Sequence, residues 1–105
     1  DDFEKEKQVI KQEFETKRED LLAKLNQKTM IQGFQVKATD NGVYMMPVLD
    51  GKTLAEDEFE ALDDNVKREF EERSELVQEQ VFEALAEMKA IEKEAEKKKI
   101  LAGQK

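Results

Sequence analysis

The chain has 105 residues, of which 42% are charged and 38% are hydrophobic, and its net charge at pH 7 is −8. This length allows one domain at most, and many charged residues with only four Gly and one Pro are typical of long exposed helices. The absence of His and Cys excludes His-dependent catalysis, Cys nucleophiles, disulfides and thiolate metal sites within this chain.

Residues 1–31 predict a long charged helix. Its apolar residues recur with steps of 7, 4, 7 and 4, an 11-residue period that keeps them on one face of a nearly straight helix. The helix should end at Gly33, because Gly readily takes the left-handed conformation that follows a helix. The pattern is already helical at residue 1, which indicates a fragment of a longer protein. The seam consists of Phe3, Ile10, Phe14, Leu21 and Leu25.

Residues 33–49 predict a β-hairpin around Asn41-Gly42, a dipeptide that favours a two-residue turn. That turn would pair Ala38 with Met45, Val36 with Pro47 and Phe34 with Leu49. A three-residue loop over residues 40–42 would pair Val36 with Met46 instead. Both registers give the hairpin one apolar face, so the sequence leaves the register open.

An Asp50-Gly51 turn follows, and a short helix is expected over residues 53–62 with Thr53 as its cap. Its acidic residues could form a cation site, but they lack the alternating pattern and central Gly of a calcium loop. Carboxylates at the start of a helix are favourable beside its positive end, and this interpretation is preferred. We therefore expect no metal site.

Residues 64–102 predict a second long helix, whose seam has steps of 4, 7, 4 and 7. Two helices with the same period should pack antiparallel, which would bring the chain ends together and place the hairpin about 40 Å away at the far tip. The run Lys97-Lys98-Lys99 fits the negative end of a helix better than a nucleic-acid or membrane site. The seam residues are Val66, Phe70, Val77, Val81 and Met88.

The expected fold is therefore mainly α with a small β element. It is a long antiparallel helical hairpin, or coiled coil, with a two-stranded β-hairpin and a short helix at the far tip. The middle of the chain is strongly acidic: residues 55–88 carry 3 basic and 13 acidic groups, a net charge of −10. This excludes a nucleic-acid partner, because phosphate binding requires a basic surface. No apolar run approaches the roughly 20 residues that span a bilayer, so no membrane association is expected.

Catalysis by this chain alone is not expected. The single serine, Ser74, lies among charged residues in the middle of the second helix, where no shielded lysine is foreseeable. There is also no GxxxxGK[ST] phosphate-binding loop.

Most of the chain, from about Phe14 to Lys99, resembles the helical insertion in the ATPase half of Lon-like ATP-dependent proteases of the bacterial and archaeal LonB/LonC kind. A departure is Ala55, where the family often has a Ser or Thr cap. The resemblance lies in ordered short motifs before a long Glu-rich helix: Gly33-Phe34, Asn41-Gly42-Val43, Pro47-Val48-Leu49-Asp50-Gly51-Lys52 and Glu58-Phe59-Glu60-Ala61-Leu62.

The resemblance implies a cytoplasmic, homohexameric parent in which an AAA-type ATPase is joined to a serine peptidase with a Ser-Lys dyad. ATP and Mg would serve that parent, whereas no catalytic or cofactor-binding residue can be assigned in this fragment. Its partners would be the parent ATPase and peptidase domains and polypeptide substrates. The implied role is a non-catalytic arm that contacts or gates those substrates.

The hairpin is the candidate contact surface. Its exposed face could meet a substrate, or its apolar residues could simply cover the end of the helix pair, since an isolated two-stranded hairpin is marginal in water. A free-standing coiled-coil scaffold or chaperone-like protein is the alternative function. The residues proposed to contact a substrate or partner are Tyr44, Met45, Met46 and Val48.

Overall fold

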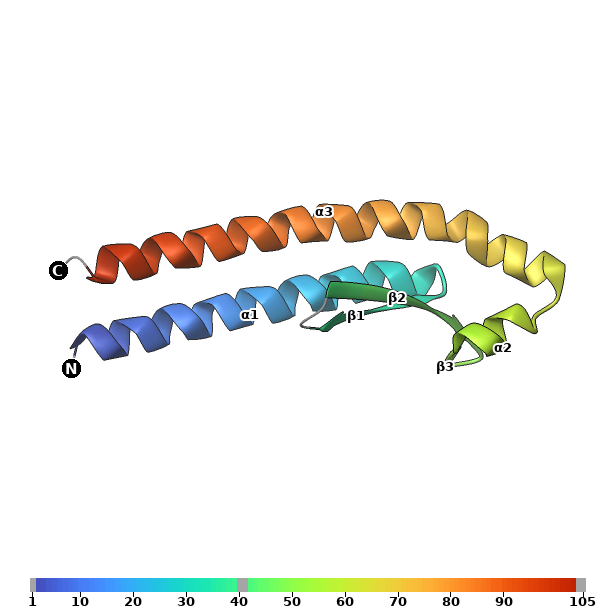
Figure 1. The fold of residues 1–105 in the computed structure, drawn as a ribbon, viewed down its shortest axis with the longest axis horizontal. Coiled ribbons are helices and arrows are strands. Elements are labelled where there is room, and N and C mark those ends of the chain that lie inside the picture. Colours follow the sequence, from blue (N-terminus) through green and yellow to red (C-terminus); the bar gives the residue numbers. More distant parts are fainter. Residues whose placement is uncertain (1, 40–41, 104–105) are drawn as a thin grey trace.

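The computed structural model describes residues 2–39 and 42–103 and shows a mainly helical rod with one small antiparallel sheet (Figure 1). Its principal extents are 62 × 21 × 21 Å. The expectation of a mainly α chain with a small β element is confirmed. The elements are α1 (Asp2–Ile31), β1 (Phe34–Thr39), β2 (Gly42–Leu49), β3 (Lys52–Thr53), α2 (Glu56–Glu60) and α3 (Asp64–Gly103).

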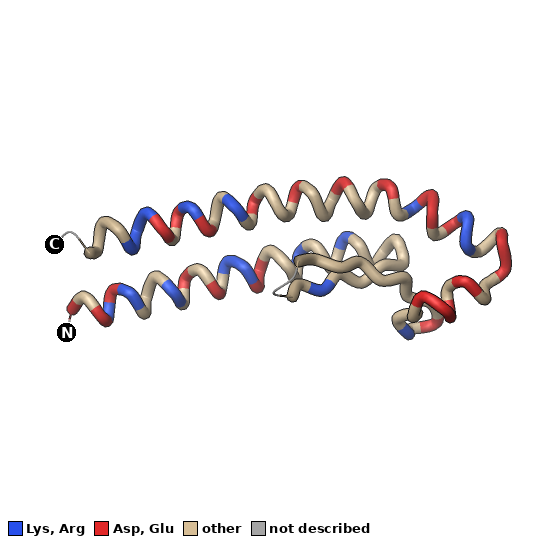
Figure 2. Tube along the Cα trace, in the orientation of Figure 1, with Lys and Arg blue, Asp and Glu red and all other residues tan. Residues whose placement is uncertain are grey.

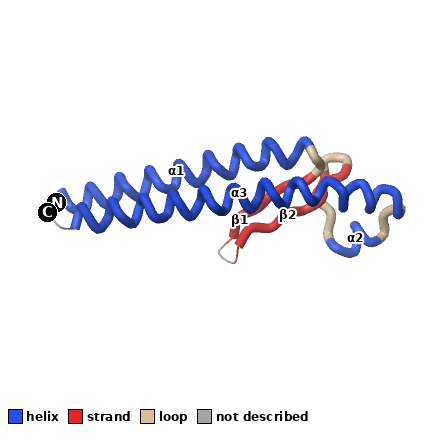
Figure 3. Tube along the Cα trace, turned by 90° about the horizontal axis from the view of Figure 1, so that it is seen from above, coloured by secondary structure: helices blue, strands red, loops and turns tan. Residues whose placement is uncertain are grey.

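Helices α1 and α3 run side by side in opposite directions, as Figures 1 and 3 both show. The start of α1 meets the end of α3, where a Cβ atom placed on Gly103 would lie 3.7 Å from the Phe3 ring. Further along, the Lys98 ammonium lies 3.4 Å from a Glu13 carboxylate oxygen. We call this part of the rod, residues 2–13 and 92–103, the terminal end.

The predicted seam residues of both helices are buried or half-buried. Ile10 and Leu25 are the most buried of the α1 set, and Phe70 and Val77 of the α3 set. The α3 core also contains Ala84 and Ala102, which the apolar pattern did not single out because alanine contributes little hydrophobic signal.

Gly33 ends α1 as expected. Its φ is +85°, its N–H donates to the Met30 carbonyl at 3.0 Å, and its carbonyl accepts from the Val48 N–H at 2.8 Å. A Cβ on this residue would lie 3.3 Å from the Phe70 ring. Glycine therefore allows both the turn and the close approach of α3.

The hairpin lies along the helices and does not extend beyond them. Strands β1 and β2 fold back beside the second half of α1, so the end of the hairpin where β1 stops and β2 begins lies near the middle of the rod (Figures 1 and 3). The expected position of the hairpin at the far tip is therefore wrong. The side chains of its inner face need the two helix seams for burial, and a ribbon beyond the helix ends would leave them in water.

Both expected hairpin registers are also wrong. The two-residue connection is residues 40–41, outside the described residues, and Gly42 is the first residue of β2 with φ +135°. A shift by two residues keeps each side chain on its face, whereas a shift by one reverses the faces. The observed register is related to the two-residue alternative in this way, so the apolar face is retained. The pairs are Phe34–Pro47, Gln35–Met46, Val36–Met45, Lys37–Tyr44, Ala38–Val43 and Thr39–Gly42.

A third strand, not expected from the sequence, follows the Asp50-Gly51 turn. Both turn residues have positive φ, 52° and 79°, as a type I′ hairpin turn requires. The turn pairs Leu49 with Lys52, and β3 adds only two residues to the sheet. The sequence offered little signal for so short a strand, since period-2 patterns need four or more residues.

The short helix α2 begins later than expected. Thr53 belongs to β3, and Ala55 occupies the position before the first helical residue, so the predicted Thr53 cap is wrong. The Glu58 carboxylate accepts from the Ala55 N–H at 3.1 Å, which supplies one half of a capping box.

The core has three sides: α1, α3 and the inner face of the sheet. One cluster contains Leu25, Val36 and Ala84, and the other contains Phe34, Phe70 and Val77, with Met45 packed against both. Phe70 meets the Phe34 ring edge-on at a centroid distance of 5.7 Å. Because the sheet covers only part of the rod, this core lies away from the terminal end.

Candidate functional site

The predicted contact residues divide between the two faces of β2. Tyr44 is on the outer face and 51% exposed, and half-buried Met46 and Val48 lie on that face with it. Met45 points the other way and packs against both core clusters. The structure thus brings Tyr44, Met46 and Val48 together and assigns Met45 to the core.

Helix α3 adds exposed apolar surface, which reaches the hairpin at Leu85. Phe82 is 69% exposed, and Leu85 lies one turn further along the helix at 37%. The sequence pattern marked both residues as a broadening of the seam, without indicating what they would face. In the structure Leu85 lines a cavity together with Gly42 and Val43 of β2.

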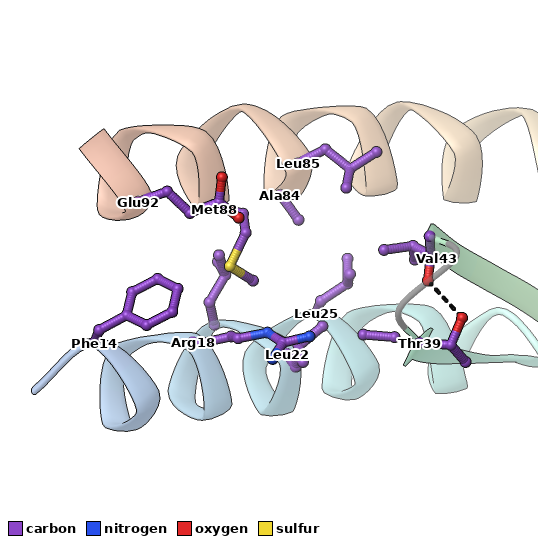
Figure 4. A pocket seen from close by; sticks show the side chains of 13 residues that line it. Phe14, Arg18, Leu22, Leu25, Thr39, Val43, Ala84, Leu85, Met88 and Glu92 are labelled. Atoms are coloured by element: carbon purple, nitrogen blue, oxygen red, sulfur yellow. Dashed lines mark hydrogen bonds between the residues drawn. The ribbon is translucent and has the colours of Figure 1, made fainter. Parts of the chain in front are cut away.

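This cavity, of about 370 Å³, lies between α1 and α3, beside the end of β1 and the start of β2 (Figure 4). Arg18 of α1 and Glu92 of α3 are its charged residues, and most of the others are apolar. Such a lining can accept an aliphatic or aromatic side chain. The lining residues are Phe14, Arg18, Leu21, Leu22, Leu25, Ala38, Thr39, Gly42, Val43, Ala84, Leu85, Met88 and Glu92.

A second groove, of about 500 Å³, lies at the terminal end. Val9 and Leu101 are 53% and 63% exposed there, and Ile10 and Ala102 form the buried side. Its charged lining residues, from both helices, are Lys5, Glu6, Glu13 and Lys98.

Asn26 holds β1 against α1, a role that sequence reasoning missed. Its side-chain oxygen accepts from the Val36 N–H at 2.8 Å, and its amide nitrogen donates to the Val36 carbonyl at 2.9 Å. One side chain thereby satisfies both backbone groups that Val36 turns away from β2. The only sequence signal was an Asn within a helix, where this residue is unfavourable unless its amide has a partner.

The polar side chains of the surface are mostly exposed charged residues. Acidic residues concentrate on α2 and the first half of α3, whereas α1 and the end of α3 carry both signs (Figure 2). No group of three His, Cys, Asp or Glu within residues 2–39 and 42–103 is placed to hold a metal ion. The Ser74 hydroxyl donates to the Glu71 carbonyl at 2.6 Å, a bond within its own helix.

No helix among the described residues is long and apolar enough to cross a membrane. Comparisons with models of protein families, with curated proteins and with solved structures found no match to this chain.

Proposed function

We propose that this chain is a non-catalytic helical arm that contacts or gates polypeptide substrates for an ATP-dependent Lon-like serine protease. In this proposal it is inserted in the AAA-type ATPase part of a cytoplasmic homohexamer, which itself uses ATP, Mg and a Ser-Lys dyad. The partners of the arm are the parent ATPase and peptidase domains and the polypeptide. The proposal includes coiled-coil packing of the two long helices, which their shared 11-residue period favours.

The observation that carries the proposal is the shape of an arm. The first residue of α1 and the last of α3 lie at the same end, so a chain could leave a parent domain and return to it there (Figure 1). The three-stranded sheet, with Tyr44 half exposed, lies well away from that end. Exposed apolar residues of the sheet could therefore contact a polypeptide while the terminal end is joined to the parent domain.

Crosslinking tests contact with polypeptides. A photoreactive amino acid at Tyr44 should crosslink unfolded casein, whereas the same group at Ala23, exposed on α1, serves as the control. Equal crosslinking at both positions, or none at Tyr44, would contradict a substrate-contacting sheet. The parent is tested separately, by looking for Walker motifs in the reading frame on either side of residues 1–105.

A free-standing scaffold or chaperone-like coiled coil is the second candidate, and the groove at the terminal end favours it. Val9 and Leu101 leave apolar surface there that a second copy could cover. Sedimentation equilibrium separates the candidates: a dimer that Val9→Glu dissociates supports the scaffold, and a monomer supports the arm.

A further inference from the structure

The outer edge of β2 is partly unpaired. Asn26 bonds both backbone groups of Val36, so these groups point away from β2. Opposed residues of an antiparallel pair point their backbone groups the same way, toward each other or both outward. Met45, opposite Val36, therefore turns its N–H and C=O to the outer edge, and Val43 does the same two residues earlier.

Strand β3 already uses this edge at its other end. Leu49 pairs with Lys52, and the Pro47 carbonyl accepts from the Leu54 N–H at 2.8 Å. The chain then leaves for α2, and no other described strand pairs with β2 over Val43 and Met45. The outward backbone groups of Val43 and Met45, which we call the vacant positions, therefore lie on the same edge of β2 that already pairs with β3.

An exposed stripe runs along one flank of α3 and reaches the vacant positions at Leu85. Leu85 of this stripe lines the cavity with Val43 (Figure 4), whereas Gln80, on the other flank of α3, bonds Gln32 at the end of α1 at 2.9 Å. Steps of 4, 3, 4 and 3 place the stripe residues on one face of the helix. All five are exposed: Glu71, Glu75, Gln78, Phe82 and Leu85.

We propose that this edge binds a short extended polypeptide segment as a fourth strand, and that basic segments with alternate apolar residues bind best. The backbone groups of Val43 and Met45 specify an extended partner, because they match the hydrogen-bond spacing of a strand. Phe82 and Leu85 offer apolar contact to alternate side chains. Glu71 and Glu75 select positive charge, as does the net charge of −10 over residues 55–88.

This inference rests on the proposed function, since it names the substrate class and the binding mode of the arm. It assigns the hydrogen bonds to the edge of β2 and leaves Tyr44, on the outer face, as a neighbouring contact.

The test uses a fluorescent nine-residue peptide that alternates Lys or Thr with Val. The first control peptide has Glu in place of Lys. The second control is a pair of peptides with N-methyl groups on alternate amides, one pair member methylated at odd and the other at even positions, so that the methyl groups of one of them face β2. Each hydrogen bond lost weakens binding several-fold, so we expect one methylated peptide to lose about tenfold in affinity. The Glu peptide should bind at least tenfold more weakly at low salt, and this difference should shrink at high salt.

Protein variants locate the site. Val43→Pro removes a backbone N–H that points to the outer edge of β2. Pro47, on the same side of this strand, shows that proline is tolerated there. Val43→Ala is the control that keeps the N–H. Phe82→Ala should weaken binding about threefold to tenfold, as expected for lost apolar contact, whereas Leu76→Ala, also exposed but on the opposite flank, should not. Circular dichroism confirms that each variant is folded.

Three results would overturn the inference: binding unchanged by N-methylation at odd and at even positions, binding unchanged by Val43→Pro, or a dimer of the chain that Val43→Pro dissociates, since the edge would then belong to a second copy. The first two leave the proposed function intact if Tyr44 still crosslinks casein. Loss of casein crosslinking with normal binding of the basic peptide contradicts the substrate-contact role instead.

Discussion

The Asn26 side chain bonds both backbone groups that Val36 presents at the edge of the sheet. The Val36 N–H and C=O would otherwise face α1 without partners, and unpaired polar groups at a half-buried edge are costly. This contact also fixes which backbone groups of β1 point toward β2. A single residue of α1 thereby determines which residues of β1 form hydrogen bonds with β2.

Replacing Asn26 by Leu should lower the free energy of unfolding by about 1–3 kcal/mol, because both Val36 groups lose their partners. Urea denaturation followed by circular dichroism measures this. Gln27→Leu, at the next and exposed position of α1, is the matched control and should change stability by less than about 0.5 kcal/mol. Equal effects of both substitutions would contradict the role of Asn26.

Gly33 and Gly103 each lie close to an aromatic ring, but only Gly33 has a positive φ. Gly33→Ala should cost about 1–3 kcal/mol, because alanine is strained at φ +85° and its Cβ would lie 3.3 Å from Phe70. Gly103→Ala, helical and 3.7 Å from Phe3, should leave stability unchanged or raise it by up to about 1 kcal/mol. Thermal unfolding of the two variants measures the contrast, and a stable Gly33→Ala protein would contradict it.

The sheet and α3 are joined through Phe70, which touches Phe34 and Phe59 edge-on. The first contact reaches β1 and the second reaches α2, so Phe70 ties the sheet and α2 to the long helix. Phe82, on the same helix, is mostly exposed and contributes little to this core.

Phe70→Ala should therefore cost about 3–5 kcal/mol, whereas Phe82→Ala should change stability by less than about 0.5 kcal/mol. For a core this small, the first loss can abolish the cooperative transition altogether. Urea denaturation of both variants is the measurement. A similar loss at Phe82 would show that this ring is buried in solution.

Local signals identified the elements but not how they fit together. Gly33, Asp50-Gly51 and the two seams were read correctly because each depends on neighbours in sequence. The hairpin register depends on Asn26, which lies ten residues before Val36, and on the burial of one strand face. The half-exposed outer face was foreseeable at Tyr44, and the two-residue register already put Met45 on the apolar face. The packing of Met45 against both core clusters was not foreseeable, because it depends on both helices.

The whole molecule is a rod with little interior. Its radius of gyration, over Cα atoms, is 18.2 Å, compared with about 13 Å for a compact domain of this length. Small-angle X-ray scattering should give a value near 18 Å for the monomer. A value near that of a compact domain would contradict the separation between the sheet and the terminal end.

Buried residues are distributed unevenly along the rod. Ile10 and Ala102 are the buried apolar residues of the terminal end, whereas Leu25, Phe70 and Val77 belong to the three-sided core. Hydrogen exchange should therefore be slowest near those core residues and faster at the terminal end, because local opening there exposes less apolar surface. Uniform exchange along α3 would contradict this expectation.

The cover that the sheet gives to one part of the rod has a mechanical consequence. Two helices alone resist bending less than two helices braced by a sheet, so stiffness falls from the sheet toward the terminal end. A load on β2 would then be carried as a lever: the braced block would move as one body, and flexure would concentrate in the bare helix pair. The terminal end would flex while the surface of the sheet keeps its shape.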